Sequence, residues 1–399
     1  MKILFINPIG ELGGAERSLL DSIWSLKRHD PSLQLELLSF APGPLLEAAR
    51  ELGIHSEVFL LPRKLQQLGE SGAVGQALTR TILRTPLALA FAARFRSWLQ
   101  SSEATILHAN GLKAHVLTAM ARLPHQKVLW HVHDFLSARP ITRHLLPWLR
   151  GRTTAALAIS QAVASDIRPL LGRLPIEVVL NGIRTEQFQR GRVVPLDLDA
   201  LAKLPPENAV RVGLIATYAH WKGQELFLEA AARVIPSGVR YYIIGGPVYM
   251  SGSSQLTEAS LRERIRALRL ENRVGLLPFQ REPARVYAAL DIVVHASTKP
   301  EPFGRTVAEG MAAGCALIAS AEGGPIEQIR DGLDGILFKP RDVDALASSL
   351  RLLLGDSALR AHLGQQAAQR ADHALHADRL GSQVFRIYQA VLDGSIVRS

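Results

Sequence analysis

Short apolar runs alternate with longer stretches of helical periodicity along almost the whole chain. This alternation is typical of βαβ units, in which helices connect parallel strands. In the first half we predict strands at residues 2–7, 33–40, 56–60, 105–110, 127–133, 155–159 and 176–180. In the second half we predict strands at residues 210–217, 239–245, 273–277, 292–296, 316–320 and 335–338. The pattern therefore predicts two doubly wound α/β sheets, with ligands bound beyond the carboxyl ends of the strands.

The periodic pattern is interrupted between residues 182 and 208, where Gly191, Pro195, Pro205 and Pro206 fall close together. We therefore predict an N-terminal Rossmann-like domain at residues 1–185, a linker at 186–207 and a C-terminal Rossmann-like domain at 208–375. Residues 376–399 are expected to form a helix that packs back toward the N-terminal domain. The cleft between the two domains is the expected active site.

The composition of the 399 residues is that of a globular enzyme, because 47% of them are hydrophobic and 21% are charged. Cys315 is the only cysteine, which excludes an internal disulfide and a thiolate metal cluster. No apolar run approaches the roughly 20 residues that span a bilayer. The first residues turn too early into a glycine-containing loop to be a secretory signal. We therefore expect a cytoplasmic protein without a transmembrane span.

Positive charge is concentrated in the first half of the chain. Residues 63–152 contain 13 Lys and Arg residues but only 3 acidic ones. Within this range, residues 78–99 and 139–152 combine arginines with Leu and Trp. Each segment is either a core-facing helix with a solvated basic face or a helix that docks on an anionic membrane. Peripheral association of residues 63–152 with the inner face of the cell membrane is therefore one of two open interpretations.

The strongest chemical motif lies at residues 299–310, between the strand at 292–296 and a helix. Phe303 and Gly304 are expected at the start of that helix, where unpaired amides and the helix dipole suit a diphosphate. Glu301 precedes the helix, and Glu309 lies about a turn and a half inside it. The two carboxylates are thus placed to accept hydrogen bonds from different hydroxyl pairs of one ligand.

Two further segments follow the strands of the first half. Gly14 lies in a Gly-Gly loop after the first strand, where glycine permits close approach of a ligand. His131 and His133 alternate at the end of the strand at 127–133, while Asp134 faces the other way, which argues against a metal site. His131 is predicted to be structural.

Two acidic pairs imitate a metal-binding motif, Asp197 with Asp199 and Asp342 with Asp344. Both pairs are predicted helix starts, because an aspartate is a favoured N-cap. No metal ion is expected.

Glu301 and Glu309 are separated by seven residues and are followed by Met-Ala-Ala-Gly at 311–314. Together with Gly-Gly-Ala-Glu at 13–16, Trp-Lys-Gly at 221–223 and Glu-Gly-Gly-Pro-Ile-Glu at 322–327, they resemble the E-x7-E element and accompanying motifs of the retaining GT-B glycosyltransferases of family 4. The resemblance extends over almost the whole chain. It implies two Rossmann-like domains that face a central cleft, with the acceptor on the N-terminal domain and the nucleotide sugar on the C-terminal domain.

The resemblance also implies a role for each matching residue of the second half. Glu301 would hold hydroxyl groups of the donor sugar, Phe303 and Gly304 would present amides to the diphosphate, and Glu309 would bind the ribose. Lys222 would neutralise phosphate charge.

The family usually carries an arginine five or six residues before this lysine. Here Ala216 and Thr217 occupy those positions. Arg305 is a candidate for the missing positive charge.

In the first half, Gly14 would contact the donor phosphate, and His133 matches the V-H-D element whose histidine lies near the reacting centre. His108, Asn110 and Ser160, which end neighbouring strands, are candidates for the acceptor side.

The resemblance implies a retaining, metal-independent hexosyltransferase that needs no cofactor. Its donor is expected to be a UDP- or GDP-sugar, and its acceptor a glycan or a lipid-linked glycan of cell-envelope or exopolysaccharide synthesis. A sugar-nucleotide 2-epimerase of the same fold and a non-catalytic binding relative are the alternatives. Nucleic acid is not expected as a partner, since the sequence contains no recognisable nucleic-acid motif or aromatic stacking cluster.

Overall fold

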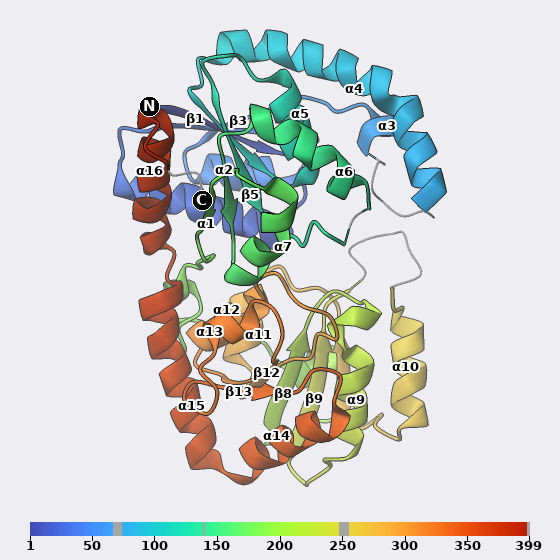
Figure 1. Ribbon diagram of the computed structural model, residues 1–399. Coiled ribbons are helices and arrows are strands. Elements are labelled where there is room, and N and C mark those ends of the chain that lie inside the picture. The colour runs from blue at the N-terminus through green and yellow to red at the C-terminus, as the bar shows by residue number, and fades with distance from the viewer. Residues whose placement is uncertain (67–73, 139, 247–254, 397–399) are drawn as a thin grey trace. The chain divides into compact units, whose positions relative to one another are not determined.

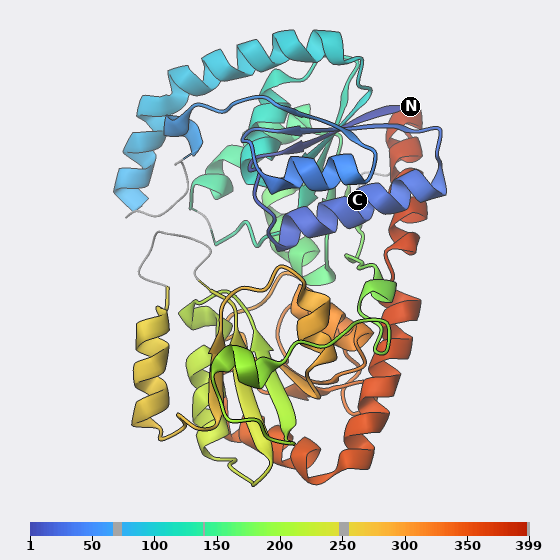
Figure 2. The ribbon, with the colours of Figure 1, turned by 180° about the vertical axis from the view of Figure 1, so that it is seen from behind.

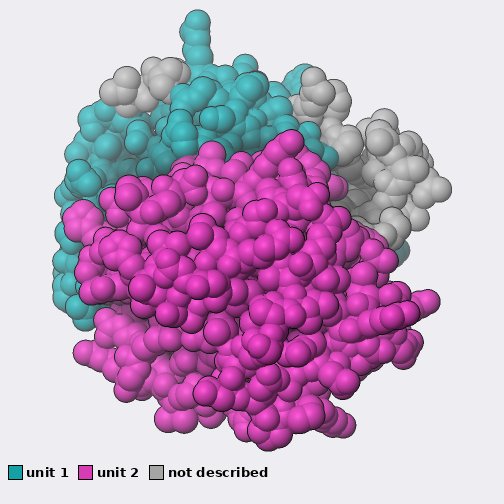
Figure 3. Space-filling view, turned by 90° about the horizontal axis from the view of Figure 1, so that it is seen from below, with its two compact units in different colours: residues 1–182, 377–399 teal, residues 183–376 magenta. Residues whose placement is uncertain are grey.

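The computed structural model describes residues 1–66, 74–138, 140–246 and 255–396, and the chain divides into two compact units. Unit 1 consists of Met1–Gly182 and Ala377–Ser399, and unit 2 of Ile183–His376 (Figure 3). Each unit contains its own parallel sheet with connecting helices, which makes each a Rossmann-like α/β domain. The α/β fold with two doubly wound sheets is therefore confirmed.

Unit 1 is built on a seven-stranded sheet with the order β3-β2-β1-β4-β5-β6-β7. The strands are β1 Lys2–Asn7, β2 Gln34–Ser39, β3 His55–Val58, β4 Ile106–Asn110, β5 Lys127–Val132, β6 Ala155–Ala158 and β7 Ile176–Val178. The helices are α1 Gly14–His29, α2 Pro44–Glu51, α3 Arg63–Gln66, α4 Val74–Ser102, α5 Leu112–Ala121, α6 Pro140–Leu149, η1 Arg150–Arg152, α7 Gln161–Leu171 and α16 Asp378–Asp393. Strands β4 and β6 are buried at every position, as expected for a parallel sheet covered on both faces.

The last helix of the chain belongs to unit 1. Helix α16 packs across α1, as the red and blue helices show in both ribbon views (Figures 1 and 2). Its side chains Leu380, Val384 and Tyr388 join the core cluster that contains Leu19 and Ile23 of α1. The C-terminal segment is thus part of the hydrophobic core of unit 1.

Unit 2 is built on a six-stranded sheet with the order β10-β9-β8-β11-β12-β13. The strands are β8 Val210–Ile215, β9 Val239–Ile244, β10 Val274–Leu277, β11 Ile292–His295, β12 Ala316–Ser320 and β13 Ile336–Phe338. The helical elements are η2 Thr185–Gln187, α8 Leu198–Ala202, η3 His220–Lys222, α9 Gln224–Ala232, α10 Glu258–Ala267, α11 Pro283–Ala288, α12 Arg305–Ala312, α13 Pro325–Gln328, α14 Val343–Gly355, α15 Ser357–Arg370 and η4 Ala371–Leu375. Its core lies between the sheet and helices such as α9 and α14.

Every predicted strand is present, and the ends differ from the prediction by at most two residues. The two acidic pairs stand at helix starts, as predicted. Asp197 caps α8 by accepting from the amide of Ala200 at 3.0 Å, and Asp342 caps α14 by accepting from the amide of Ala345 at 2.9 Å. Asp197 and Asp342 therefore act as N-caps, which is a structural role.

The basic region at residues 63–152 covers α3 to η1. Arg139, residues 67–73 and the side chains of Arg80 and Arg84 lie outside what the structure describes. Across the described ranges, no helix is both long enough and apolar enough to cross a membrane.

Candidate active site

The predicted donor residues of unit 2 lie at the carboxyl edge of its sheet. Lys222 ends η3, which follows β8, and Glu301 lies in the loop between β11 and α12. The Nζ atom of Lys222 donates to both carboxylate oxygens of Glu301, at 2.7 Å each. Strands β8 and β11 are neighbours in the sheet, which is why the loops that follow them meet. The structure therefore joins these two predicted residues in one ion pair.

Two more polar side chains hold Glu301. The Oγ atom of Ser297 donates to its Oε2 atom at 3.0 Å, and Nε2 of His295 lies 3.5 Å from the same oxygen. Burial alone would raise the pKa of Glu301, but the Lys222 ammonium and His295 outweigh it and hold this pKa well below its usual range. Glu301 is therefore an ionised acceptor at neutral pH, which suits the binding of hydroxyl groups.

The turn that carries Lys222 depends on a glycine. Gly223 has a φ of +74°, and an added Cβ would lie 1.9 Å from the carbonyl oxygen of Ala296. The amide of Thr298 donates to the carbonyl of Trp221 at 2.7 Å, which ties this turn to the loop after β11. Only glycine fits so close to the neighbouring backbone, so Gly223 fixes where Lys222 stands.

Phe303 and Gly304 stand at the start of α12, as predicted from the sequence. Gly304 is the N-cap of this helix with a φ of +87°, and Phe303 is buried. Gly324 approaches so closely that an added Cβ would lie 2.3 Å from the carbonyl oxygen of Phe303. The amide of Gly324 also donates to the carbonyl of Glu301 at 2.7 Å. Backbone contacts with Gly324 thus hold the loop that leads into the start of α12.

Glu309 lies inside α12 and is only 6% exposed. The Nε atom of Arg305 donates to its Oε1 atom at 2.7 Å, one turn earlier in the same helix. Tyr287 lies on the other side, where burial first and then the Glu309 charge raise the pKa of its hydroxyl well above the usual range. Arg305, the candidate for the missing positive charge, is therefore paired with the carboxylate of Glu309.

In unit 1, Gly14 is the first residue of α1, and a Cβ added there would meet nothing within 4 Å. Glu16, two residues later, accepts from the amide of Gly13 at 3.1 Å and from the Asn7 side chain at 3.4 Å. Burial raises the pKa of Glu16. Asn110 donates to Oδ1 of Asn7 at 2.6 Å. The glycine loop is thus connected through Asn7 to the end of β4.

His133 follows β5, and its ring lies beside that of His131, with 4.2 Å between the ring centroids. The Nε2 atom of His133 is buried and has no hydrogen-bond partner among the described residues. Burial, followed by the nearby histidines, lowers the pKa of His133 well below its usual value. At neutral pH the ring is therefore neutral and retains an uncommitted nitrogen.

The three candidates for the acceptor side are all buried. Ser160 is the N-cap of α7, and its Oγ atom accepts from the amide of Val163 at 3.1 Å. His108 is fully buried, and Asn110 is 1% exposed. Each of the three side chains makes hydrogen bonds within unit 1. These bonds do not indicate a contact with a ligand.

Sequence reasoning missed His295 and Ser297 as neighbours of Glu301. His295 ends β11, and Ser297 follows it. Polar residues at the carboxyl end of a buried strand are a sequence signal that indicates a position beside the ligand site. Sequence reasoning also missed Tyr287 as a neighbour of Glu309, for which no such signal exists, because Tyr287 lies within helix α11 and reaches Glu309 only through tertiary packing.

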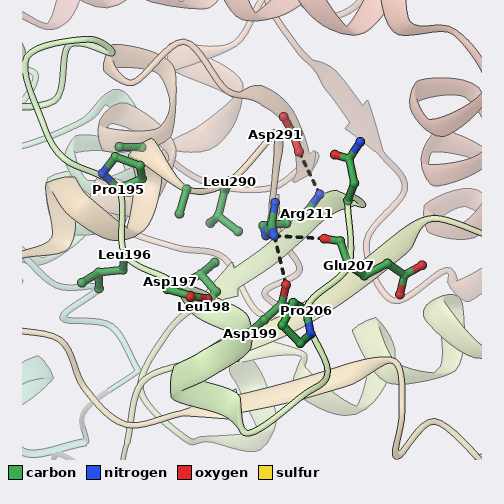
Figure 4. Close-up of a pocket in the computed structure, with 13 residues that line it drawn as sticks. Pro195, Leu196, Asp197, Leu198, Asp199, Pro206, Glu207, Arg211, Leu290 and Asp291 are labelled. Atoms are coloured by element: carbon green, nitrogen blue, oxygen red, sulfur yellow. Dashed lines mark hydrogen bonds and ion pairs between the residues drawn. The ribbon is translucent and has the colours of Figure 1, made fainter.

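A surface cavity of about 560 Å³ lies elsewhere in unit 2 (Figure 4). Arg211 is the second residue of β8. Its amide donates a hydrogen bond to Asp291 at 2.8 Å, and its guanidinium donates one to Asp199 at 3.0 Å. These residues precede or begin strands, so the cavity is at the amino edge of the sheet. None of the predicted site residues lines it. Within the described residues, no three His, Cys, Asp or Glu side chains are grouped as they would be around a metal ion.

Two family models match the chain. The model described as "Glycosyl transferases group 1" matches residues 201–370, and the model described as "Glycosyltransferase Family 4" matches residues 12–187. The chain belongs to the GT-B glycosyltransferases of family 4. All six donor-site residues named above in unit 2 fall within the first match, and His133 falls within the second.

The chain is similar to D-inositol 3-phosphate glycosyltransferase of Mycobacterium ulcerans, with 33% identity over 205 residues. This match covers 50% of the chain but only 41% of the relative. It is also similar to 2-deoxystreptamine glucosyltransferase of Streptomyces kanamyceticus, with 26% identity over 55% of the chain and 56% of the relative. The chain therefore spans about half the length of these curated relatives, or less.

Among solved structures, the Anabaena protein Alr3699/HepE in complex with UDP and glucose is 26% identical, with a TM-score of 0.79. The match covers 98% of this chain and 100% of that one. The same protein in complex with UDP-glucose gives 25% identity and a TM-score of 0.77. The similarity to these structures thus extends over both units.

Proposed function

We propose that the protein transfers a hexose from a nucleotide diphosphate sugar, such as UDP- or GDP-glucose, to a hydroxyl of an acceptor. The observation that carries this proposal is the Lys222–Glu301 ion pair beside the start of α12, with Glu309 inside the same helix. Membership of family 4 and the likeness to a protein solved with UDP-glucose support it. Together they favour a sugar nucleotide as the ligand of unit 2.

In this proposal the donor divides the polar groups of unit 2 among its parts. Glu301 accepts hydrogen bonds from sugar hydroxyls, the amides at Phe303 and Gly304 bind the diphosphate, and Glu309 binds the ribose. The ammonium of Lys222, which is paired with Glu301, turns to the diphosphate when the donor binds. Arg305 then supplies the second positive charge.

The unit 1 residues contribute the other side of the reaction. Gly14 admits the donor phosphate, and His133 hydrogen-bonds the sugar near its anomeric carbon. His108, Asn110 and Ser160 support the acceptor side. The bond between the anomeric carbon and the diphosphate oxygen breaks while a bond to the acceptor oxygen forms on the same face. The acceptor proton passes to the departing diphosphate, so configuration is retained without a protein nucleophile.

We further propose that the reaction needs no metal ion, since Lys222 and the α12 amides suffice to stabilise the leaving group. Chelator treatment is expected to leave transfer unchanged. Loss of activity in chelator and its return with Mg²⁺ or Mn²⁺ would contradict this part of the proposal.

For the acceptor we propose a glycan or lipid-linked glycan of cell-envelope or exopolysaccharide synthesis, reached at the cytoplasmic face of the membrane. The basic region at 63–152 supports this, and so does Trp148 of α6, whose side chain is 84% exposed next to the exposed Arg150. Salt-sensitive binding to vesicles with anionic lipid, reduced in Trp148→Ala, is the expected result. Absence of such binding would remove the membrane from the proposal.

The deciding experiment combines binding with product analysis. Thermal unfolding is measured with UDP, GDP, ADP and their glucose or mannose derivatives, because a ligand of the folded state at 100 times its Kd stabilises by about 2.7 kcal/mol. Chosen donors are then incubated with acceptors, including inositol phosphate and aminocyclitols. Free nucleotide diphosphate with an α-glycosylated product supports the proposal. An epimerised nucleotide sugar without acceptor transfer supports the alternative enzyme.

A further inference from the structure

Tyr388 of α16 reaches a histidine of the unit 1 sheet that is distant in sequence. Its hydroxyl lies 2.7 Å from Nδ1 of His108, which is 280 positions earlier. Both side chains are fully buried. For the C-terminal segment that contains Tyr388, the sequence predicts only a helix. None of the predicted roles therefore accounts for this contact.

Helix α16 is held firmly enough to fix the position of this hydroxyl. Gly381 packs so tightly on α1 that an added Cβ would lie 2.4 Å from the carbonyl oxygen of Ser25. The amide of Gly381 donates to Oγ of Ser25 at 2.7 Å, and that hydroxyl donates to the carbonyl of Asp378 at 3.0 Å. In Figures 1 and 2 the red helix α16 crosses the blue helix α1, with which it is in contact.

The hydrogen-bond chain continues from His108 to the end of β5. The Nε2 atom of His108 lies 3.0 Å from Nδ1 of His131, on the neighbouring strand. His131 is 2% exposed, and its ring lies beside His133. Its Nε2 atom is buried without a hydrogen-bond partner in the described part of the chain. We refer to Tyr388, His108 and His131 as the relay.

The positions of the protons in the relay follow from the number of N–H and O–H donors that its three side chains carry. Burial lowers the pKa of His108 well below its usual value and that of His131 to about 3, so each ring is neutral and carries one N–H. If Tyr388 accepted from His108, both its own O–H and the lone pair on Nε2 of His131 would be buried without a partner, whereas the opposite direction leaves only Nε2–H of His131 unpartnered in the described part of the chain. Such a group costs about 1–3 kcal/mol. Tyr388 therefore donates to Nδ1 of His108, and Nε2–H of His108 donates to Nδ1 of His131.

One donor is left at the end of the relay, Nε2–H of His131. It lies at the carboxyl end of a parallel strand, where Rossmann-like sheets bind ligands. We propose that His131 donates this hydrogen bond to an oxygen of the substrate that binds beside His133, and that Tyr388 and His108 are positioning residues that keep the proton on Nε2. The sequence alone had suggested a purely structural His131. This inference rests on the proposed glycosyl transfer for the identity of the substrate.

The test begins with the unmodified protein, labelled with ¹⁵N in its histidine side chains. Nitrogen NMR distinguishes protonated from unprotonated ring nitrogens. We expect Nε2–H tautomers for His108 and His131, and a shift of the His131 Nε2 signal when UDP-glucose or the acceptor is added. An Nδ1–H tautomer of His131 would overturn the relay, whatever the enzyme proves to do.

Variants then test the consequence for transfer. Tyr388→Phe removes the hydroxyl but keeps the ring, so both His131 tautomers become populated and kcat falls about twofold to tenfold while the donor KM stays within twofold. Tyr241→Phe is the matched control, because Tyr241 is equally buried and donates only to the carbonyl of Val234 in unit 2. It is expected to lose stability but not the NMR signature of His131.

A second pair of variants separates donor chemistry from packing. His131→Gln keeps an N–H donor and is expected to retain most of the transfer rate, while His131→Leu is expected to lose about tenfold or more. Equal rates in the two variants, with no ligand-induced shift in the unmodified protein, would overturn the donor role. A protein that binds no nucleotide sugar would overturn the proposed function and its substrate, while the tautomer result would still decide the relay.

Discussion

The Nζ atom of Lys222 lies 2.7 Å from both carboxylate oxygens of Glu301, although the two residues are 79 positions apart. Their side chains are 16% and 14% exposed, so the pair is largely withdrawn from solvent. The cation proposed for the diphosphate thus neutralises the anion proposed for the sugar. In the proposed function, the donor replaces this bond with two new ones, so that both groups keep a polar partner.

Replacing Lys222 with methionine removes the charge but keeps most of the aliphatic stem. We expect donor affinity to fall about tenfold to a hundredfold, because hydrogen bonds to charged groups contribute about 1.5–3 kcal/mol. Stability should fall by roughly 2 kcal/mol, since Glu301 loses its main partner. Calorimetric titration with the active nucleotide sugar measures the first effect and urea unfolding the second.

Lys339→Met serves as the control, because the Lys339 side chain is 81% exposed and its nearest acid, Asp342, lies 3.9 Å away. This variant should bind the donor normally. If Lys222→Met bound the donor as tightly as Lys339→Met and transferred at the same rate, Lys222 would have no part in donor binding.

Replacing Glu309 with glutamine tests the ribose contact. The variant keeps the shape of the side chain but loses the charge-assisted bond with Arg305, which is 2.7 Å long. We expect the affinity for the nucleoside diphosphate to fall about tenfold, with the same loss for the full donor, because the missing contact lies at the ribose. Titration with the nucleotide and with the nucleotide sugar gives both values.

Glu263→Gln on the exposed side of α10 is the matched change. It should alter neither affinity. Undiminished turnover and unchanged nucleotide affinity in Glu309→Gln would remove the ribose role from this residue.

The sequence predicted the strands well because their signal is local. The run at residues 155–158, for example, is apolar, and the structure buries it completely. The motif around Glu301 and Gly304 was equally readable, since a strand, a loop and a helix start follow each other directly. Topology then predicted that Lys222 and Glu301 share an edge, but not that their side chains pair.

The contacts that the sequence did not predict depend on packing between distant segments. Nothing near Tyr388 in sequence indicates His108 as its partner, because that contact follows from the way α16 lies on α1. Ser160 illustrates a different limit. A serine between a strand and a helix fits both a ligand contact and an N-cap, and its bond from the amide of Val163 is the capping one.

Gly223 offers a steric test of the turn that carries Lys222. Alanine there would have to adopt a φ of +74° with its Cβ 1.9 Å from the carbonyl oxygen of Ala296. We expect Gly223→Ala to lose about 2 kcal/mol of stability or more, and to weaken donor binding because the turn shifts. Thermal unfolding with and without the donor measures both effects.

Gly355→Ala is the control for this substitution. Gly355 ends α14, is exposed, and a Cβ added there meets nothing within 4 Å. Its replacement should be neutral or stabilise by up to about 1 kcal/mol. A Gly223→Ala protein as stable as Gly355→Ala would show that the turn does not need glycine.

The buried histidines of unit 1 predict that acid weakens its fold. Burial lowers the pKa of His115 to about 4 and that of His131 to about 3, and it lowers those of His108 and His133 well below 6.5. These groups are neutral when folded and take up protons on unfolding below pH 6.5. Their contribution to stability is therefore complete above pH 6.5 and is lost as the pH falls toward the folded pKa values.

Between pH 6.5 and 4.5, each such histidine should reduce the free energy of unfolding, with a slope that approaches about 1.4 kcal/mol per pH unit. Glu16 opposes this by at most one proton, because burial raises its pKa. Urea unfolding followed by tryptophan fluorescence suits the measurement, since Trp24, Trp98, Trp130 and Trp148 lie in unit 1.

His115→Gln isolates one of these protons. His115 donates from Nε2 to the carbonyl of His131 at 3.0 Å, and glutamine keeps an N–H donor for that bond while removing the titration. The pH slope of the variant should be smaller than that of the unmodified protein by up to one proton. An unchanged slope in His115→Gln would mean that His115 takes up no proton on unfolding in this pH range. A free energy of unfolding of the unmodified protein that does not fall between pH 6.5 and 4.5 would mean that the other rings, those of the relay included, are already protonated in the folded state. In that case each relay ring would carry two N–H groups, and His108 would have no lone pair to accept from Tyr388.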